Sequence, residues 1–243
     1  MRVVKVYGAL YLQALHKTGE GLRRNAWTLL LPMLLTVGAM LAGMIVAPLG
    51  LIGGFVLGFV MAALTASYLY FLSEIVAGSP VKFEELKQSF GPYLWSVINV
   101  LFIFFVVRLA VTLLGGGSAG ILMLALTLVA MIAFNALPET LYIRGTYNGL
   151  DTLRSSFEFL RDNLLAWAIP NVPGVALLIF GLPIINAIVV RALFGVLPMT
   201  VVSIVLSAIA GVFIHVAMIF RGHLYKELAG TTHRQRMFRY GSG

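Results

Sequence analysis

The chain has 243 residues, of which 60% are hydrophobic and only 11% are charged. Soluble domains carry about 25% charged residues, and one water-exposed fold cannot hide this much apolar surface in its core. The composition therefore predicts that lipid surrounds most of the chain. The absence of cysteine excludes disulfides and thiol catalysis. The net charge of +8 lies beside apolar segments rather than in one basic domain, so we expect no nucleic-acid partner.

Six apolar segments are long enough to cross a bilayer, which takes about 20 mainly apolar residues. In chain order we expect these crossings at 27–46, 50–72, 93–114, 119–137, 164–190 and 197–220. Short turns rich in Gly or Pro join them in pairs. The predicted fold is therefore an all-α membrane protein, with six transmembrane helices in three hairpins and a cytoplasmic amphipathic helix before each hairpin. We expect a single transmembrane domain over 1–243 with a basic tail at 222–243.

The distribution of positive charge predicts the orientation. Fifteen of the 17 Lys and Arg residues fall in the four segments 1–25, 74–92, 138–163 and 221–243. An excess of Lys and Arg marks the cytoplasmic side of a membrane protein. All four segments share one side only if the number of crossings is even. We therefore expect a multi-pass protein of the plasma (inner) membrane with both termini in the cytoplasm.

An internal repeat is visible in two junctions. Asn25 follows Leu-Arg-Arg and stands seven residues before Pro32, and Asn163 follows Leu-Arg-Asp and stands seven residues before Pro170. The offset between these two asparagines also pairs Leu12 with Leu150 and Leu15 with Leu153. We interpret this as a duplicated unit, with a weaker middle copy. The predicted units cover about 1–73, 74–138 and 139–221.

Each predicted unit begins with apolar residues at helical spacing. They are Val3, Tyr7, Leu10 and Ala14 in the first unit, Phe83, Leu86 and Phe90 in the second, and Leu150, Leu153, Phe157, Leu160 and Leu164 in the third. Such helices either lie flat in the headgroup layer or pack beneath the bundle as core, and both alternatives remain open. The predicted interfacial anchors, at the level of the lipid phosphates, are Arg23, Arg24, Asn25, Arg161 and Asn163.

Together, the leucine-rich amphipathic segment, the Leu-Arg-x-Asn junction and the repeated hairpins resemble bacterial six-helix membrane families of uncharacterised function. The plan is similar to that of the membrane domain attached to some glycerophosphodiester phosphodiesterases. Catalysis in that family belongs to a separate soluble domain. The resemblance therefore implies no catalytic residue in this chain.

One short motif matches a catalytic pattern. Ser118 stands in Gly-Gly-Ser-Ala-Gly, the spacing of a nucleophile elbow, and a histidine, His215, lies on the last crossing. His215 follows Pro198 by 17 residues, which places it about 25 Å deeper than Ser118. A serine and its base must approach within about 3 Å, so we expect no catalytic pair. His215 and His223 lack a third ligand nearby, so we predict neither a metal site nor a cofactor.

The fifth crossing is the most irregular, because three prolines interrupt it. A broken helix can place free backbone groups at a mid-membrane binding site. The alternative is a kinked helix whose gaps are filled by neighbouring helices. Arg108, inside the third crossing, is costly unless it reaches the interface or finds a partner. The candidate ligand or lipid residues are therefore Arg108, Asn171, Pro173 and Asn186.

Three functions fit these observations. The first is a non-catalytic accessory or scaffold subunit of a transport or envelope complex, with membrane lipids and other membrane subunits as partners. The second is a permease or lipid-handling protein that uses the proline-broken fifth crossing. The third, an intramembrane hydrolase built on Ser118, is the least favoured because of the depth argument above.

Overall fold

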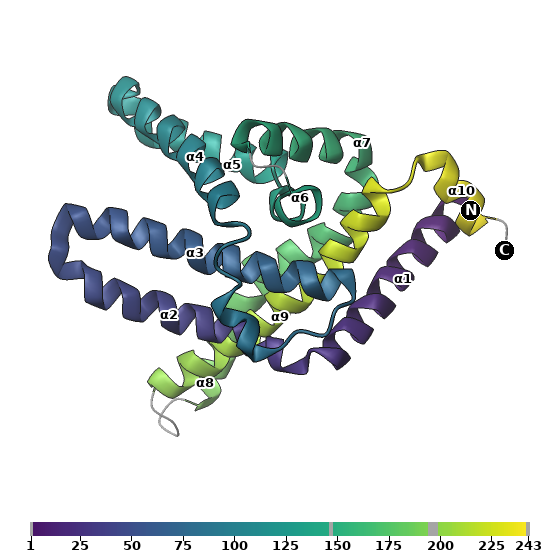
Figure 1. The fold of residues 1–243 in the computed structure, drawn as a ribbon, viewed down its shortest axis with the longest axis horizontal. Helices are drawn as coiled ribbons and strands as arrows, with labels where there is room; N and C mark the ends of the chain where they lie inside the picture. The colour runs from purple at the N-terminus through teal and green to yellow at the C-terminus, as the bar shows by residue number, and fades with distance from the viewer. Residues whose placement is uncertain (1, 146–147, 194–198, 242–243) are drawn as a thin grey trace. The chain divides into compact units, whose positions relative to one another are not determined.

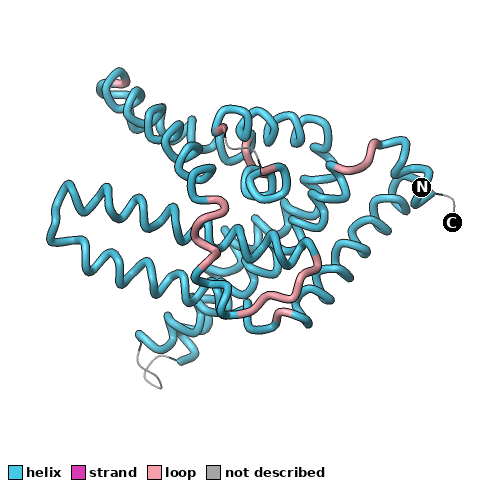
Figure 2. Tube along the Cα trace, in the orientation of Figure 1, coloured by secondary structure: helices cyan, strands magenta, loops and turns pink. Residues whose placement is uncertain are grey.

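The computed structural model describes residues 2–145, 148–193 and 199–241. These residues form helices joined by short loops and no strand (Figures 1 and 2). Five stretches among them are long and apolar enough to cross a membrane: Ala26–Ala77, Leu94–Leu114, Gly116–Ala133, Gly149–Ala192 and Ile204–Ala229. The prediction of an all-α chain with several apolar helices of membrane length is confirmed.

Ten α-helices are described in chain order. They are α1 (Arg2–Arg24), α2 (Leu31–Val46), α3 (Gly50–Ala77), α4 (Leu94–Leu114), α5 (Ala119–Ala133), α6 (Leu137–Arg144), α7 (Gly149–Ala176), α8 (Leu182–Leu193), α9 (Met199–Ala229) and α10 (His233–Gly241). Four short 3₁₀ turns separate some of them: η1 (Ala26–Leu30), η2 (Ala47–Leu49), η3 (Phe83–Lys87) and η4 (Gly116–Ser118). A π-helical turn, η5 (Leu177–Gly181), joins α7 to α8.

The longest apolar stretch, Ala26–Ala77, is not one straight helix. α2 ends at Val46, and η2 with its proline follows. Gly50 then begins α3 with a φ of 56°, a backbone conformation that suits glycine because it has no Cβ. The chain reverses its direction at this point, as Figure 1 shows.

The described contacts divide the chain into two compact units. The first unit contains Met1–Gly38, Ile75–Pro80 and Leu165–Gly243, and the second contains Ala39–Glu74 and Val81–Leu164. The single domain and the three successive repeat units expected from the sequence stay predictions.

In the first unit, α1 packs along α9 and α10. Its buried stripe repeats every four residues, at Val6, Leu10, Ala14 and Thr18, which is the spacing of one helical face. On another side of the same helix Leu12 is 68% exposed. The amphipathic N-terminal helix therefore packs as core along one stripe and keeps apolar surface outside it.

In the second unit, the first half of α7 has a similar double character. Leu153, Ser156 and Leu160 are buried, while Leu150 and Phe157 are exposed. The buried side chains stand three or four residues apart and form one face. As in α1, apolar side chains remain outside the packed face.

The middle copy departs from the expected plan. Its segment forms only the five-residue turn η3 rather than an amphipathic α-helix. Pro80 and Pro92 lie close on either side of it, and proline restricts helix on both sides. A buried hydrogen bond of 2.6 Å between the hydroxyls of Ser67 and Ser89 joins this segment to α3. The short helix α6 was not expected, and Pro138 stands in its first turn, where proline is favoured.

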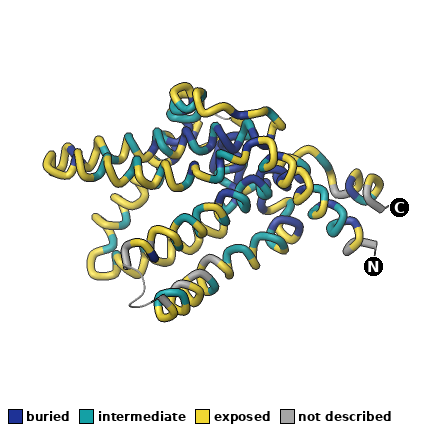
Figure 3. The backbone as a smooth tube through the Cα atoms, turned by 90° about the horizontal axis from the view of Figure 1, so that it is seen from below, coloured by how far each residue is buried: buried dark blue, intermediate teal, exposed yellow. Residues whose placement is uncertain are grey.

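Burial is uneven along the apolar helices. In α3 the buried hydrophobic side chains begin at Ala62 and continue to Val76, toward its C-terminal end. In α4 the buried residues are Ser96, Val97 and Val100, close to its start, and α5 has none. Figure 3 shows exposed positions along most of the helical length. The far ends of these helices therefore offer apolar surface that the described chain does not cover.

Candidate functional site

A pocket of about 260 Å³ in the first unit combines charged side chains from distant parts of the sequence. It lies where the end of α1, the end of α3 and the end of α9 meet. Its charged or titratable lining residues are Lys17, Glu20, Arg24, His223, Lys226 and Glu227. We call it the basic pocket, because three cations face two carboxylates there.

Close helix approach builds the floor of the basic pocket. A Cβ on Gly21 would stand 3.0 Å from Cγ2 of Ile75 and 4.0 Å from Nε2 of His223, so the missing side chain lets these residues come close. The side-chain amide of Asn25 donates to the carbonyl of Gly21 at 3.0 Å and to that of Ser79 at 3.3 Å. These bonds hold the end of α1 against the loop that follows α3.

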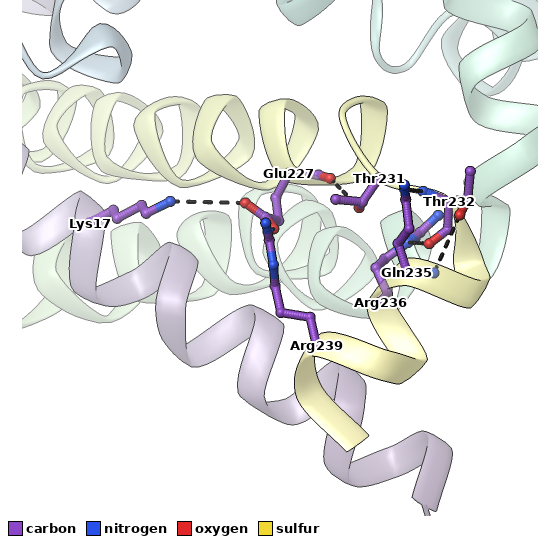
Figure 4. Close-up of polar contacts among 7 residues, drawn as sticks. All are labelled: Lys17, Glu227, Thr231, Thr232, Gln235, Arg236 and Arg239. Carbon is purple, nitrogen blue, oxygen red and sulfur yellow. Dashed lines mark hydrogen bonds and ion pairs between the residues drawn. The ribbon is translucent and has the colours of Figure 1, made fainter. Parts of the chain in front are cut away.

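The two α9 side chains at the mouth have different partners. Nζ of Lys226 donates to the carbonyl of Val76, 3.5 Å away, at the end of α3. The carboxylate of Glu227 lies 3.9 Å from Nζ of Lys17 and 2.7 Å from Nη1 of Arg239, as Figure 4 shows. Glu227 thus joins α1, α9 and α10, and two cations already neutralise its charge.

Two further groups of the pocket have no such partner. Arg24 is exposed in the last turn of α1, and no described residue pairs with its guanidinium. His223 is only 8% exposed, and its ring nitrogen Nε2 finds no hydrogen-bond partner among the described residues. Lys17, Lys226 and Glu20 lie within electrostatic range of this ring.

A buried polar and aromatic cluster lies deeper in the first unit. A ring nitrogen of His215 is 3.1 Å from Oγ1 of Thr28, and both residues are fully buried. Trp167 meets the Tyr225 ring edge-on at a centroid distance of 6.2 Å, and the Arg221 guanidinium lies 5.0 Å from the centroid of Trp167. These contacts tie η1, α7 and α9 together.

The two asparagines expected at the interface have the same local geometry. Asn25 has φ −125° and ψ 39°, and Asn163 has φ −126° and ψ 20° inside α7, where it marks a kink. Each donates its side-chain amide to the carbonyl four residues earlier, at 3.0 Å for Asn25 and at 3.1 Å for Asn163. Both residues therefore end one helical segment and start the next.

The three arginines expected as anchors are all exposed. Nε of Arg161 lies 3.0 Å from Oδ1 of Asp162, its neighbour in the chain. Arg23 and Arg24 both stand in the last turn of α1. Arg24 lines the basic pocket, and Arg23 is not among its lining residues.

The fifth expected crossing stays helical through two of its prolines. α7 contains Pro170 and Pro173 and continues into η5 and α8. The amide of Asn171 donates to the carbonyl of Trp167 at 2.7 Å, within the same helix. Pro173 is exposed, and the side chain of Asn186 lies outside the described part of the chain.

Arg108 lies on α4, exposed, beside an apolar cavity of about 550 Å³ in the second unit. Residues of α4, α5, α6 and the start of α7 line this cavity, as does Phe134 in the turn after α5, whose ring meets that of Phe104 edge-on. No described carboxylate pairs with Arg108. The structure therefore places this cation against an apolar space.

The serine and the histidine of the hydrolase hypothesis lie in different environments. Ser118 is exposed in the short turn η4. His215 is buried against Thr28. Sequence reasoning did not assign His223 and Lys226 to a site, because their neighbours Lys17 and Arg24 stand about 200 residues earlier. The only sequence signal for His223 was its spacing from His215 on the last helix.

Comparison of the chain with protein-family models, with curated proteins and with solved structures gives no significant match. The resemblance to six-helix bacterial membrane families therefore stays a prediction.

Proposed function

We propose that the chain is a non-catalytic integral membrane protein, an accessory or scaffold subunit of a transport or envelope complex in the plasma (inner) membrane. It crosses the membrane six times as three hairpins, with both termini in the cytoplasm. The reversal at Ala47–Leu49 supports two crossings within the first apolar stretch. The matched geometry of Asn25 and Asn163 supports a duplicated unit.

The observation that carries the subunit proposal is a stripe of small residues on α3. Gly54, Gly58, Ala62 and Ala66 stand four residues apart and so share one face. Ala62 and Ala66 are buried, while a Cβ on Gly54 or Gly58 would meet nothing within 4 Å. In lipid, small residues let two helices approach closely. The open end of the stripe thus fits a helix from another chain.

The state of α5 points the same way. No described residue of this helix is buried, although its span has a mean hydropathy of 2.0. A helix in lipid gains stability by packing against other helices. It gains none by leaving the lipid tails, which are as apolar as its own side chains. A helix with no buried position in its own chain leaves surface available to another subunit.

Extraction in a mild detergent tests the subunit proposal. The wild-type chain should migrate with a second membrane chain, either another subunit or another copy. A Gly54→Leu/Gly58→Leu double variant should lose that partner, because the leucines hold the helices apart. Gly43→Leu on α2 is the control and should keep the partner, since its Cβ also meets nothing within 4 Å. A wild-type monomer, or a double variant that keeps its partner, would contradict the proposal.

A lipid-handling function is the second candidate, and the cavity beside Arg108 favours it. An apolar space of about 550 Å³ next to one cation suits the chain and headgroup of an anionic lipid. Native mass spectrometry should then find a lipid retained by the wild type and lost when Val107→Trp fills the cavity. If both chains retain the same lipid, this cavity does not hold it.

A further inference from the structure

We infer that the basic pocket of the first unit binds an anionic phosphate group, either on a lipid headgroup or on a soluble phosphate compound. The inference goes beyond the subunit function. It rests on three cations and a buried histidine that line one cavity and come from two separate segments of the chain, the ends of α1 and α9.

The charge that remains free in the pocket is positive. Glu227 already lies against Lys17 and Arg239, so the cations Arg24 and Lys226 outnumber the one remaining carboxylate, that of Glu20. Arg24 has no described partner. Its guanidinium is planar and donates two parallel hydrogen bonds to a phosphate, the geometry that arginine favours.

The buried histidine adds a directed hydrogen-bond group. Buried polar atoms nearly always have a partner, yet Nε2 of His223 has none among the described residues. This nitrogen lies beside Gly21, at the floor of the pocket. Nε2 has almost no surface open to the pocket, so a phosphate oxygen would accept a hydrogen bond from Nε2–H where the imidazole turns toward the cavity.

The helix end that forms the third wall would repel an anion if its carbonyls were free, because a helix C-terminus carries partial negative charge. Nζ of Lys226 donates to the carbonyl of Val76 there. The ammonium offsets the negative helix end and leaves two further N–H groups for a ligand. The pocket therefore favours an anion over a cation.

The place of the pocket suits a lipid phosphate. Its lining comes from residues 17–25, 75–78 and 223–227, where the apolar helices α3 and α9 end. Phosphates of the cytoplasmic leaflet lie at the ends of such helices. Binding of a lipid rests on the membrane placement proposed above, whereas binding of soluble phosphate does not require it.

The test uses the purified full chain in phosphatidylcholine nanodiscs and isothermal titration calorimetry. One arm titrates inorganic phosphate, and the other titrates short-chain phosphatidic acid. Binding of both, or of phosphatidic acid alone, supports a lipid headgroup, and binding of inorganic phosphate alone supports a soluble compound. Binding of neither overturns the inference, whatever the chain does with partner subunits.

Matched variants localise the binding. Arg24→Gln removes a pocket cation and should weaken binding about tenfold or more, as expected for loss of a charged hydrogen bond. Arg23→Gln removes a neighbouring exposed arginine outside the pocket and should leave the affinity unchanged. His223→Gln should also weaken binding. Equal effects of Arg23→Gln and Arg24→Gln would show diffuse surface attraction and overturn the inference; because both arginines are exposed, both variants should fold.

Discussion

At the scale of single residues, Tyr11 satisfies a backbone group that a proline leaves without a partner. Pro170 has no N–H, so it cannot donate to the carbonyl four residues earlier, that of Ala166. The hydroxyl of Tyr11 donates to this carbonyl at 2.9 Å. Burial, together with the nearby Tyr7, raises the pKa of the Tyr11 phenol, so the hydroxyl keeps the proton that it donates. The sequence identified the proline, but only the packing of α1 could identify its partner.

Tyr11→Phe should therefore destabilise the chain by about 1–3 kcal/mol, the cost of leaving a buried carbonyl unpaired. Unfolding by SDS in detergent micelles measures the change. The wild type should also lose stability as the pH rises above the ordinary phenol pKa of 10.0, because the folded state holds this proton more tightly. The variant should lose less over that range. Equal stability at neutral pH would contradict the role assigned to this hydroxyl.

At the scale of elements, apolar length and turn residues predicted α3, α4 and α5 to within a few residues. The same approach was wrong for the middle copy, where prolines lie close to both ends of the segment and only η3 forms. It also missed α6, whose residues are mixed in character. The basic pocket was not predictable from the pattern, since Arg24 and Lys226 meet only because α1 packs along α9.

The contact between α7 and α4 depends on the absence of a side chain at Gly149. A Cβ there would stand 2.8 Å from Cδ1 of Ile103 and 2.9 Å from the backbone carbonyl of Asn99. Gly149→Ala should destabilise the chain by about 1–3 kcal/mol, as other overpacked contacts do. Gly174→Ala in the same helix is the control, because its Cβ meets nothing within 4 Å. Thermal unfolding in detergent compares them, and equal midpoints would refute the close approach.

The attachment of α10 depends on Glu227. Thr232 and Gln235 form a reciprocal cap at its start (Figure 4), and Arg239 reaches back to Glu227. Glu227→Gln should loosen α10, with faster hydrogen exchange over 233–241. Because such pairs are worth at most about 1 kcal/mol when partly exposed, global stability should change little.

Glu158→Gln is the control for that experiment. It removes the exposed pair of Glu158 with Arg154, 2.9 Å apart within α7, and should leave exchange over 233–241 unchanged. Unaltered exchange in the Glu227→Gln variant would show that other contacts hold α10.

At the scale of the whole molecule, composition and charge predicted that lipid surrounds most of the chain. Long apolar helices carry exposed side chains along most of their length, as expected where lipid rather than water is the solvent. The partner that we propose for the small-residue stripe of α3 was not predictable, because a sequence pattern identifies a helix face and not its occupant.

The central claim is that the charged segments all face the cytoplasm while the turns between paired crossings face outward. The chain has no cysteine, so single cysteines report accessibility without background. A membrane-impermeant maleimide applied to intact cells should label Gly117→Cys, and should label Lys82→Cys, Arg154→Cys and Arg234→Cys only after permeabilisation. Labelling of Lys82→Cys or Arg154→Cys in intact cells would contradict the account.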